Sequence, residues 1–122
     1  MAVTTSTASS PLVTTIVTDI DSDTTVESAA SAAQFLYFVE IINPNNVGVY
    51  TKIFASGGGS TNQNQHYLQL YCQAASSCYM YIPASLAIAN GIQFYTPIES
   101  GSVNSQNDPT SDVTVKSGCT AQ

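Results

Sequence analysis

The sequence predicts an all-β fold: an antiparallel β-sandwich or jelly roll of about seven strands with an extended N-terminal arm. Short runs of β-branched and aromatic residues recur from residue 34 onward, and turn-forming residues separate them at regular intervals. The 122 residues, of which 43% are hydrophobic, are enough to fill one core of ordinary size. We therefore expect one compact unit built from strands.

Residues 1–33 differ in composition from the rest of the chain. They are rich in Thr, Ser and Ala and contain no aromatic residue, whereas aromatic residues begin at Phe35. The β-branched run over residues 11–20 predicts one strand within this region. We expect an N-terminal arm with one strand over residues 1–33 and a β-sandwich domain over residues 34–122.

A first hairpin is predicted where the aromatic residues begin. Residues 34–42 are almost continuously apolar, which is typical of a central strand covered on both faces. The Asn-Pro-Asn-Asn sequence that follows favours a turn, because proline fixes φ and asparagine tolerates unusual backbone angles. Residues 48–55 then predict the partner strand, so the two runs form a hairpin with a longer loop.

A second hairpin is predicted around two cysteines. Residues 66–72 alternate between two faces, and residues 79–82 form the next strand, which stops at Pro83. Residues 85–89 suit either a helical turn or an extended segment. The remaining expected elements are a turn at Asn90 and Gly91, a strand over residues 92–100 that is broken or bulged at Pro97, and a closing strand over residues 112–116.

The charge of the chain excludes several classes of partner. Two lysines, no arginine and eight acidic residues give a net charge of −6. Nucleic-acid binding needs cations that displace phosphate counterions, so we expect no such partner. The same deficit argues against an anionic membrane surface, and no apolar run approaches the roughly 20 residues that span a bilayer. The N-terminus has no signal-peptide pattern.

The cysteine spacing predicts one disulfide. Five residues separate Cys72 from Cys78, so this pair is the easiest of the three pairings to close. A disulfide belongs to oxidising surroundings, which release by lysis or in a particle would supply without a signal peptide. Cys119 follows Gly118 in a polar tail and is expected to be an idle thiol rather than an intermolecular bridge. The spacing does not fit a zinc or CxxC redox site.

An acidic cluster invites comparison with a calcium loop. Four acids fall within nine positions: Asp19, Asp21, Asp23 and Glu27. The loop pattern requires glycine at its sixth position and glutamate at its twelfth, but Thr24 and Ala30 stand there. We favour a solvated acidic turn and expect no metal and no cofactor.

No residue pattern indicates catalysis. His66 is the only histidine, no G-x-S-x-G motif occurs, and a triad would need an acid and a serine that sequence cannot place. Residues 57–60 (GGGS) resemble a phosphate loop, but no lysine follows them. We predict no catalytic residue and no enzyme activity.

Four tyrosines near the cysteine pair form a candidate binding face: Tyr67, Tyr71, Tyr79 and Tyr81. Tyrosine is favoured where an apolar ring meets a wet rim, and sugar rings stack on such residues. Two interpretations remain open, a glycan-binding tip and rings that pack across strands or line an oligomer interface. The second is given more weight.

The segment FLYFVEIINPNNVGVYTKIF, residues 35–54, resembles small virion proteins of tailed bacteriophages, which share a hydrophobic strand, an acid, an Asn-rich turn and a Val-Tyr-x-Lys strand. Residues 91–94 and 113–115 fit later parts of that pattern. The cysteine loop replaces the proline-rich segment that is usual there. The resemblance implies a β-sandwich particle component and brings no catalytic residue with it.

We therefore expect a virion structural protein, most simply a capsid decoration or cement protein, assembled in the host cytoplasm and released by lysis. Its expected partners are other virion proteins, namely major capsid or tail proteins, and copies of itself in a homo-oligomer such as a trimer. The alternative is a tail or fibre module that binds a receptor or glycan.

Overall fold

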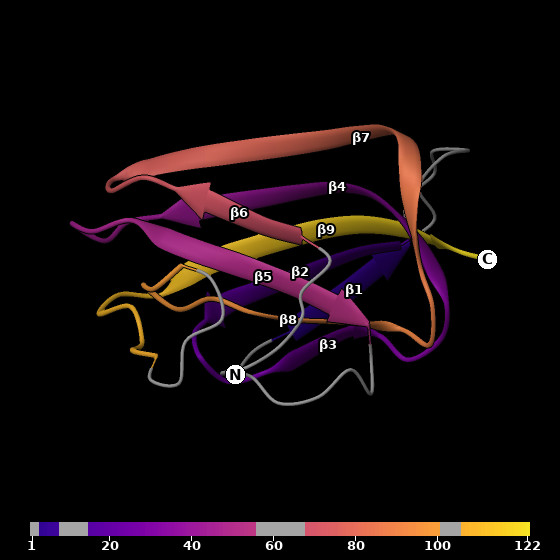
Figure 1. Ribbon diagram of the computed structural model, residues 1–122, viewed down its shortest axis with the longest axis horizontal. Coiled ribbons are helices and arrows are strands. Elements are labelled where there is room, and N and C mark those ends of the chain that lie inside the picture. The colour runs from indigo at the N-terminus through magenta and orange to yellow at the C-terminus, as the bar shows by residue number, and fades with distance from the viewer. Residues whose placement is uncertain (1–2, 8–14, 56–67, 101–105) are drawn as a thin grey trace.

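The chain is an all-β sandwich, as the sequence predicts (Figure 1). The computed structural model describes residues 3–7, 15–55, 68–100 and 106–122. Within these ranges nine strands form two antiparallel sheets, against about seven strands expected, and there is no helix. Consequently, this part of the chain contains no helix able to cross a membrane.

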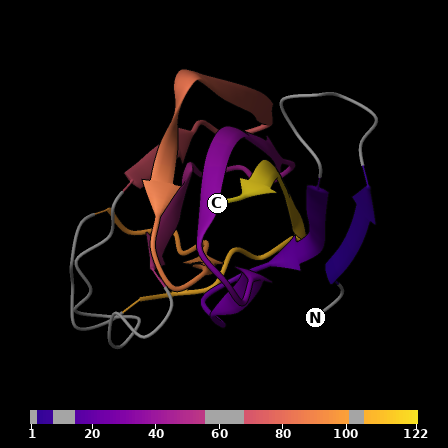
Figure 2. The same cartoon turned by 90° about the vertical axis from the view of Figure 1, so that its right-hand side faces the viewer.

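The two sheets have five and four strands. In order across the sheet, the five-stranded sheet contains β1 (Val3–Thr7), β2 (Thr15–Ser22), β9 (Val113–Ala121), β4 (Gln34–Asn43) and β7 (Ser76–Ile88). The four-stranded sheet contains β3 (Glu27–Ala30), β8 (Ile92–Tyr95), β5 (Val49–Ala55) and β6 (Leu68–Cys72). Figure 2 shows β1 at the outer edge of the molecule.

Both predicted hairpins are wrong, although their strands exist. β4 lies in the five-stranded sheet and β5 in the other, and β6 and β7 are divided in the same way. The turns after β4 and β6 therefore take the chain from one sheet to the other at the same end of the sandwich (Figure 1). β7 also includes residues 85–88 of the segment 85–89, while Ala89 begins the turn that follows, and β7 bends where the left-handed Ser85 (φ 61°) interrupts its pairing with β4.

The core lies between the inward faces of the sheets. Its members are apolar side chains from both sheets: Leu36, Val39, Ile41, Val113, Val115 and Cys119 from one, and Val49, Ile53, Cys72, Ile92 and Phe94 from the other, with Ile88 at the end of β7. Burial of such side chains contributes about 25 cal/mol per Å² of apolar surface. β5 is the strand covered on both faces, since residues 51–54 are all buried. The sequence pattern instead predicts residues 34–42, most of β4, for that position.

Residues 15–22 and 27–30 belong to the sheets. β2 pairs with β1 on one side and β9 on the other, and β3 pairs with β8. Val17 on β2 is buried at 1% exposure. The sandwich thus includes strands from the region that the sequence analysis assigned to an arm.

Candidate binding face

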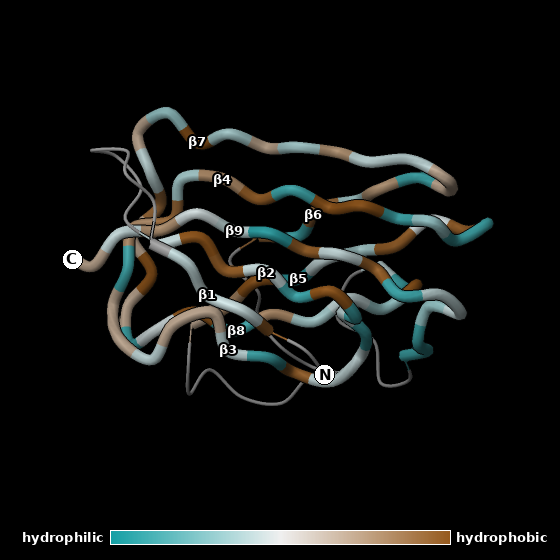
Figure 3. The backbone as a smooth tube through the Cα atoms, turned by 180° about the vertical axis from the view of Figure 1, so that it is seen from behind, coloured by the Kyte–Doolittle hydropathy of each residue, from teal (hydrophilic) through white to brown (hydrophobic). Residues whose placement is uncertain are grey.

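The outward side of the five-stranded sheet presents three cross-strand rows of side chains, here called the outer face. Residues directly opposite each other in a sheet share a face, so the strand register defines the rows. The first row contains Tyr81, Phe38, Gly118, Ile16 and Ser6; the second Tyr79, Glu40, Lys116, Thr18 and Thr4; the third Ser77, Ile42 and Thr114. Figure 3 views this sheet from outside, with β7, β4, β9, β2 and β1 following one another.

Large side chains on the outer face are open to solvent. Tyr79 and Tyr81 are 58% and 50% exposed, and Ile42 is 41% exposed. The ring of Phe38 stacks on Tyr79 with 5.5 Å between the ring centroids. A Cβ atom at Gly118 would overlap the Phe38 ring, so glycine at this position leaves room for the ring. Exposed tyrosines beside apolar groups suit contact with another molecule.

The outer face is nearly neutral although the chain is acidic. Its two charged residues, Glu40 on β4 and Lys116 on β9, stand directly opposite each other. The chain has two lysines and no arginine, and the other lysine, Lys52, is fully buried. None of the remaining seven acids (eight minus Glu40) lies in the three rows. A partner therefore meets little net charge on this side of the molecule.

The structure divides the tyrosines that the sequence singled out. Tyr79 and Tyr81 share the outer face, whereas Tyr71 lies on β6 in the opposite sheet, where its ring is 5.0 Å from that of Tyr50. Tyr67 lies outside the described residues. Two of the four are thus brought together on one face, and Tyr71 is separated from them.

Sequence reasoning did not select the other members of the outer face, such as Phe38, Glu40 and Lys116. For Phe38 and Glu40 the reason is a β-bulge at Tyr37, where β4 shifts register against both neighbours. Leu36 is fully buried and Phe38 is only partly buried, although strict alternation would place them on the same face. A bulge of this kind hides which residues of a strand point outward.

The predicted disulfide between Cys72 and Cys78 is wrong, because both residues are free thiols. Cys72 points into the core, where its Sγ donates to the carbonyl oxygens of Ser76 at 3.4 Å and Ile41 at 3.7 Å. The Sγ of Cys78 donates instead to the carbonyl oxygen of Tyr71 at 3.6 Å. Burial raises the pKa of Cys72 to about 12, with the neighbouring Cys78 adding to the rise. Cys72 is therefore a poor source of the thiolate needed for disulfide exchange.

Cys119 also differs from its expected setting. It lies on β9 inside the core at 0% exposure, so it does not belong to a polar tail. Burial raises the pKa of its thiol. In the folded chain this thiol is not accessible to a partner.

Two buried asparagines form a hydrogen-bond network at the end of the sandwich where β4 and β6 end. The Nδ2 of Asn43 donates to the carbonyl oxygens of Val47 at 2.9 Å and Cys72 at 3.2 Å. The Oδ1 of Asn45 accepts from the Ser111 amide at 2.7 Å, and the Nδ2 of Asn45 donates to Asn43 Oδ1 at 2.9 Å. Three loops are thereby joined by side-chain amides.

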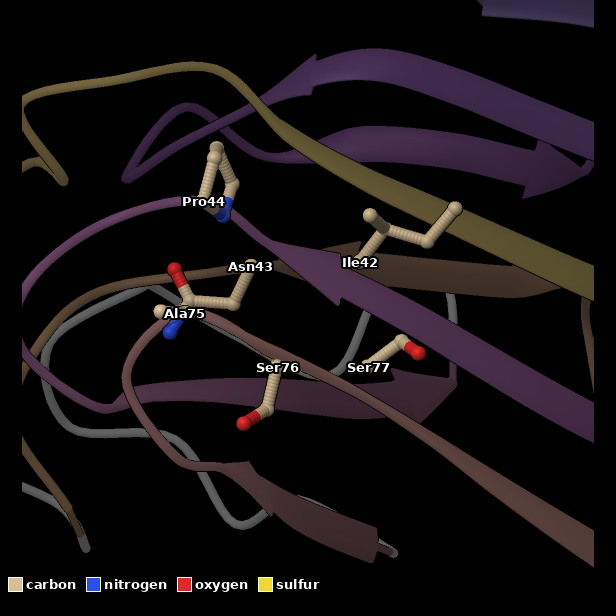
Figure 4. Close-up of a pocket in the computed structure, with 6 residues that line it drawn as sticks. All are labelled: Ile42, Asn43, Pro44, Ala75, Ser76 and Ser77. Atoms are coloured by element: carbon tan, nitrogen blue, oxygen red, sulfur yellow. The ribbon is translucent and has the colours of Figure 1, made fainter.

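A shallow depression of about 430 Å³ lies beside this asparagine pair (Figure 4). Its lining has no charged side chain and consists of Ile42, Asn43, Pro44, Ala75, Ser76 and Ser77. Ile42 and Ser77 also form the third row of the outer face. The depression therefore continues the outer face rather than forming a separate enclosed site.

The four acids near the second strand do not gather into a metal site. Asp19 faces the interior at 0% exposure, while Asp23 accepts a hydrogen bond from the Thr25 amide at 2.7 Å. In the described ranges no three His, Cys, Asp or Glu side chains are placed to hold a metal ion. His66 and residues 57–60 lie outside those ranges.

Asp19 is an unusual buried acid. Its Oδ1 accepts from the Asp21 amide at 3.2 Å, and its Oδ2 has no hydrogen-bond partner. Burial raises the pKa of Asp19 to about 7, the Asp21 amide opposes the rise, and the Asp21 and Glu27 carboxylates add to it. The carboxyl is thus protonated under mildly acidic conditions.

Lys52 is a buried base that the sequence analysis did not single out. Its Nζ lies 5.6 Å from the centroid of the Tyr95 ring and 3.4 Å from Gln106 Oε1. Burial lowers the pKa of Lys52, and the charge of Glu99 opposes that effect. Lys52 packs on the outward side of the four-stranded sheet, so Lys116 is the base left for contacts on the outer face.

No protein-family model matches the sequence, and no curated protein is detectably similar to it.

Proposed function

We propose that this chain is a structural subunit of a phage particle, of the capsid decoration or cement type, which acts by binding other virion proteins. The resemblance of residues 35–54 to small tailed-phage virion proteins supports this role, and the β-sandwich is the fold that the resemblance implies. Its proposed location is the virion, after assembly in the host cytoplasm and release by lysis. Its proposed partners are major capsid or tail proteins and further copies of the chain.

The main support is the outer face. It combines exposed Tyr79, Tyr81 and Ile42 with a single acid–base pair, in a chain of otherwise acidic surface. Surfaces of this composition, aromatic and poor in net charge, are typical of the centres of protein–protein interfaces. A sheet face that lacks an enclosed pocket among its three rows also suits a broad protein contact better than it suits capture of a small substrate.

Co-sedimentation with particles assembled without this protein tests the structural role. We expect the purified full chain to bind such particles, and a Tyr79→Ser, Tyr81→Ser double variant to bind at least tenfold more weakly. Tyr71→Ser is the matched control, since Tyr71 is similarly exposed, at 52%, on the other sheet. A wild-type chain that never sediments with particles would refute the structural role.

A second candidate function is glycan or receptor binding by a tail or fibre module. Tyr79 and Tyr81 favour it, because sugar rings stack on exposed aromatic side chains and both rings lie on one strand. Under this alternative, a glycan array probed with the full chain gives hits that the Tyr79→Ser, Tyr81→Ser variant loses and Tyr71→Ser keeps. An array without hits, together with particle binding, would refute glycan binding and support the decoration role.

A further inference from the structure

The outer face has two halves of different shape. The half formed by β7 and β4 has the bulky side chains Tyr79, Tyr81, Phe38 and Ile42. The half formed by β9 and β2 has mostly small ones, namely Gly118, Thr114 and Thr18, with Ile16 beside them. Charge follows the same division, since Glu40 stands on the bulky half and Lys116 on the small half. The boundary between the halves runs along the β4–β9 seam.

Such a division is self-complementary under one symmetry operation. A two-fold axis that lies in the plane of the face, parallel to the strands and along the β4–β9 seam, exchanges the two halves while keeping each row at its own height. Glu40 then faces Lys116 of the second copy, and Lys116 faces the second Glu40. In the flanking rows, Tyr81 faces Ile16 and Ile42 faces Thr114.

We propose that two copies of this chain pair through their outer faces about this axis, with the Glu40–Lys116 contacts at the centre. The inference rests on the proposed structural role and names the partner of the outer face as a second copy, so that the particle binds the pair and the Tyr79→Ser, Tyr81→Ser variant loses particle binding because it loses the pair. It replaces the expected trimer with a two-fold pair, because a three-fold ring would not bring the same face of each copy together. Aligned packing of two twisted sheets is an ordinary arrangement in β proteins.

The area of the face fits a small, reversible interface. Strands lie about 4.8 Å apart and rise about 3.3 Å per residue, so the four strands that overlap across the axis, over the five residues of the three rows, cover roughly 19 Å by 17 Å. β1 has no counterpart under this axis, and the flat estimate lies below the ~800 Å² that each partner buries in a standard interface. The near-neutral face is also the side on which two copies of a −6 chain repel each other least.

Charge reversal tests the arrangement directly. Analytical ultracentrifugation of the full chain is expected to show a concentration-dependent monomer–dimer equilibrium. Glu40→Lys and Lys116→Glu each place like charges across the axis and are expected to weaken the dimer at least tenfold. The double reversal restores it. Asp108→Lys, the same change of charge as Glu40→Lys at an exposed loop position bonded to Thr24, away from the three rows, leaves it unchanged.

Mixing the two single variants separates this pairing from a loss of stability within one copy. Glu40→Lys and Lys116→Glu chains are complementary to each other, so they are expected to form a heterodimer when mixed although each is monomeric alone. Thermal melts followed by circular dichroism establish that both are folded. A monomeric or trimeric wild type, or failure of the mixture to associate, overturns the pairing.

The pairing and the structural role fail in different ways. A wild-type monomer that binds particles overturns the pairing and leaves the structural role. A wild-type dimer with the expected charge-swap behaviour that does not bind particles leaves the pairing and refutes the structural role.

Discussion

Asp19 is a carboxylic acid held inside the sandwich with one oxygen unpartnered. Its pKa of about 7 in the folded chain, against an ordinary value of 3.8, means that the folded state holds a proton that the unfolded state has already released. This group therefore reduces stability as pH rises from about 4 to about 7, and the reduction is complete above that range. At about 1.4 kcal/mol for each pKa unit, the loss is on the order of 4 kcal/mol.

Replacing Asp19 with asparagine is expected to abolish that part of the pH dependence. Urea unfolding at pH 5 and pH 8 measures it: the wild type is less stable at pH 8, and Asp19→Asn shows a smaller difference between the two. Asp108 gives the contrast, because its hydrogen bonds from Thr24 lower its pKa. The stability that the ionised Asp108 contributes is therefore lost as pH falls. Equal slopes for wild type and Asp19→Asn would contradict the assignment.

The cysteines give a second prediction at the scale of residues. We expect three titratable thiols in the unfolded chain, and slow reaction of Cys72 and Cys119 in the folded chain because both are buried with raised pKa values. Intact mass without reductant, compared with mass after reduction, checks the same point. A mass lower by two hydrogens before reduction would show a disulfide and refute the prediction.

At the scale of elements, the asparagine pair holds together loops that follow different strands. Asn45→Ala removes hydrogen bonds to Asn43 and Ser111 and leaves buried polar groups unpaired. We expect a loss of about 2–4 kcal/mol in the free energy of unfolding, measured by urea titration. Asn46→Ala, an exposed neighbour in the same loop, serves as the control and should change stability by less than about 0.5 kcal/mol. Equal losses of stability in the two variants would argue against a stabilising role for the asparagine pair.

The positions of the strands could be predicted from sequence more readily than their partners. All seven expected runs overlap a strand, because β-branched and aromatic residues between turn residues are a local signal. The sheet that each strand joins is not determined by such a local signal. Asn43 lies where the chain crosses to the other sheet, and its side chain donates hydrogen bonds to the carbonyl oxygens of Cys72 and Gln73, about 30 positions away. The bulge at Tyr37 and the burial of Lys52 likewise depend on neighbours that are distant in sequence.

At the scale of the whole molecule, the region before residue 34 supplies three of the nine described strands. A chain lacking residues 1–33 would leave β9 without its partner β2 and β8 without β3. We expect residues 34–122 alone to show no cooperative thermal transition by near-ultraviolet circular dichroism. Deletion of residues 1–7, which removes only the edge strand β1, should leave the transition in place. A cooperative melt of the shorter piece would show that the sandwich does not need β2 and β3.

The last of the described strands, β9, lies at the middle of the five-stranded sheet, between β2 and β4. A ribosome makes β2 and β4 long before it makes residues 113–121, so neither strand can acquire this neighbour while the intervening chain is still being synthesised. The five-stranded sheet is therefore completed late, and until then β2 and β4 each lack β9 as their hydrogen-bonded neighbour. A nascent chain in this condition exposes unpaired strand edges, which favour aggregation.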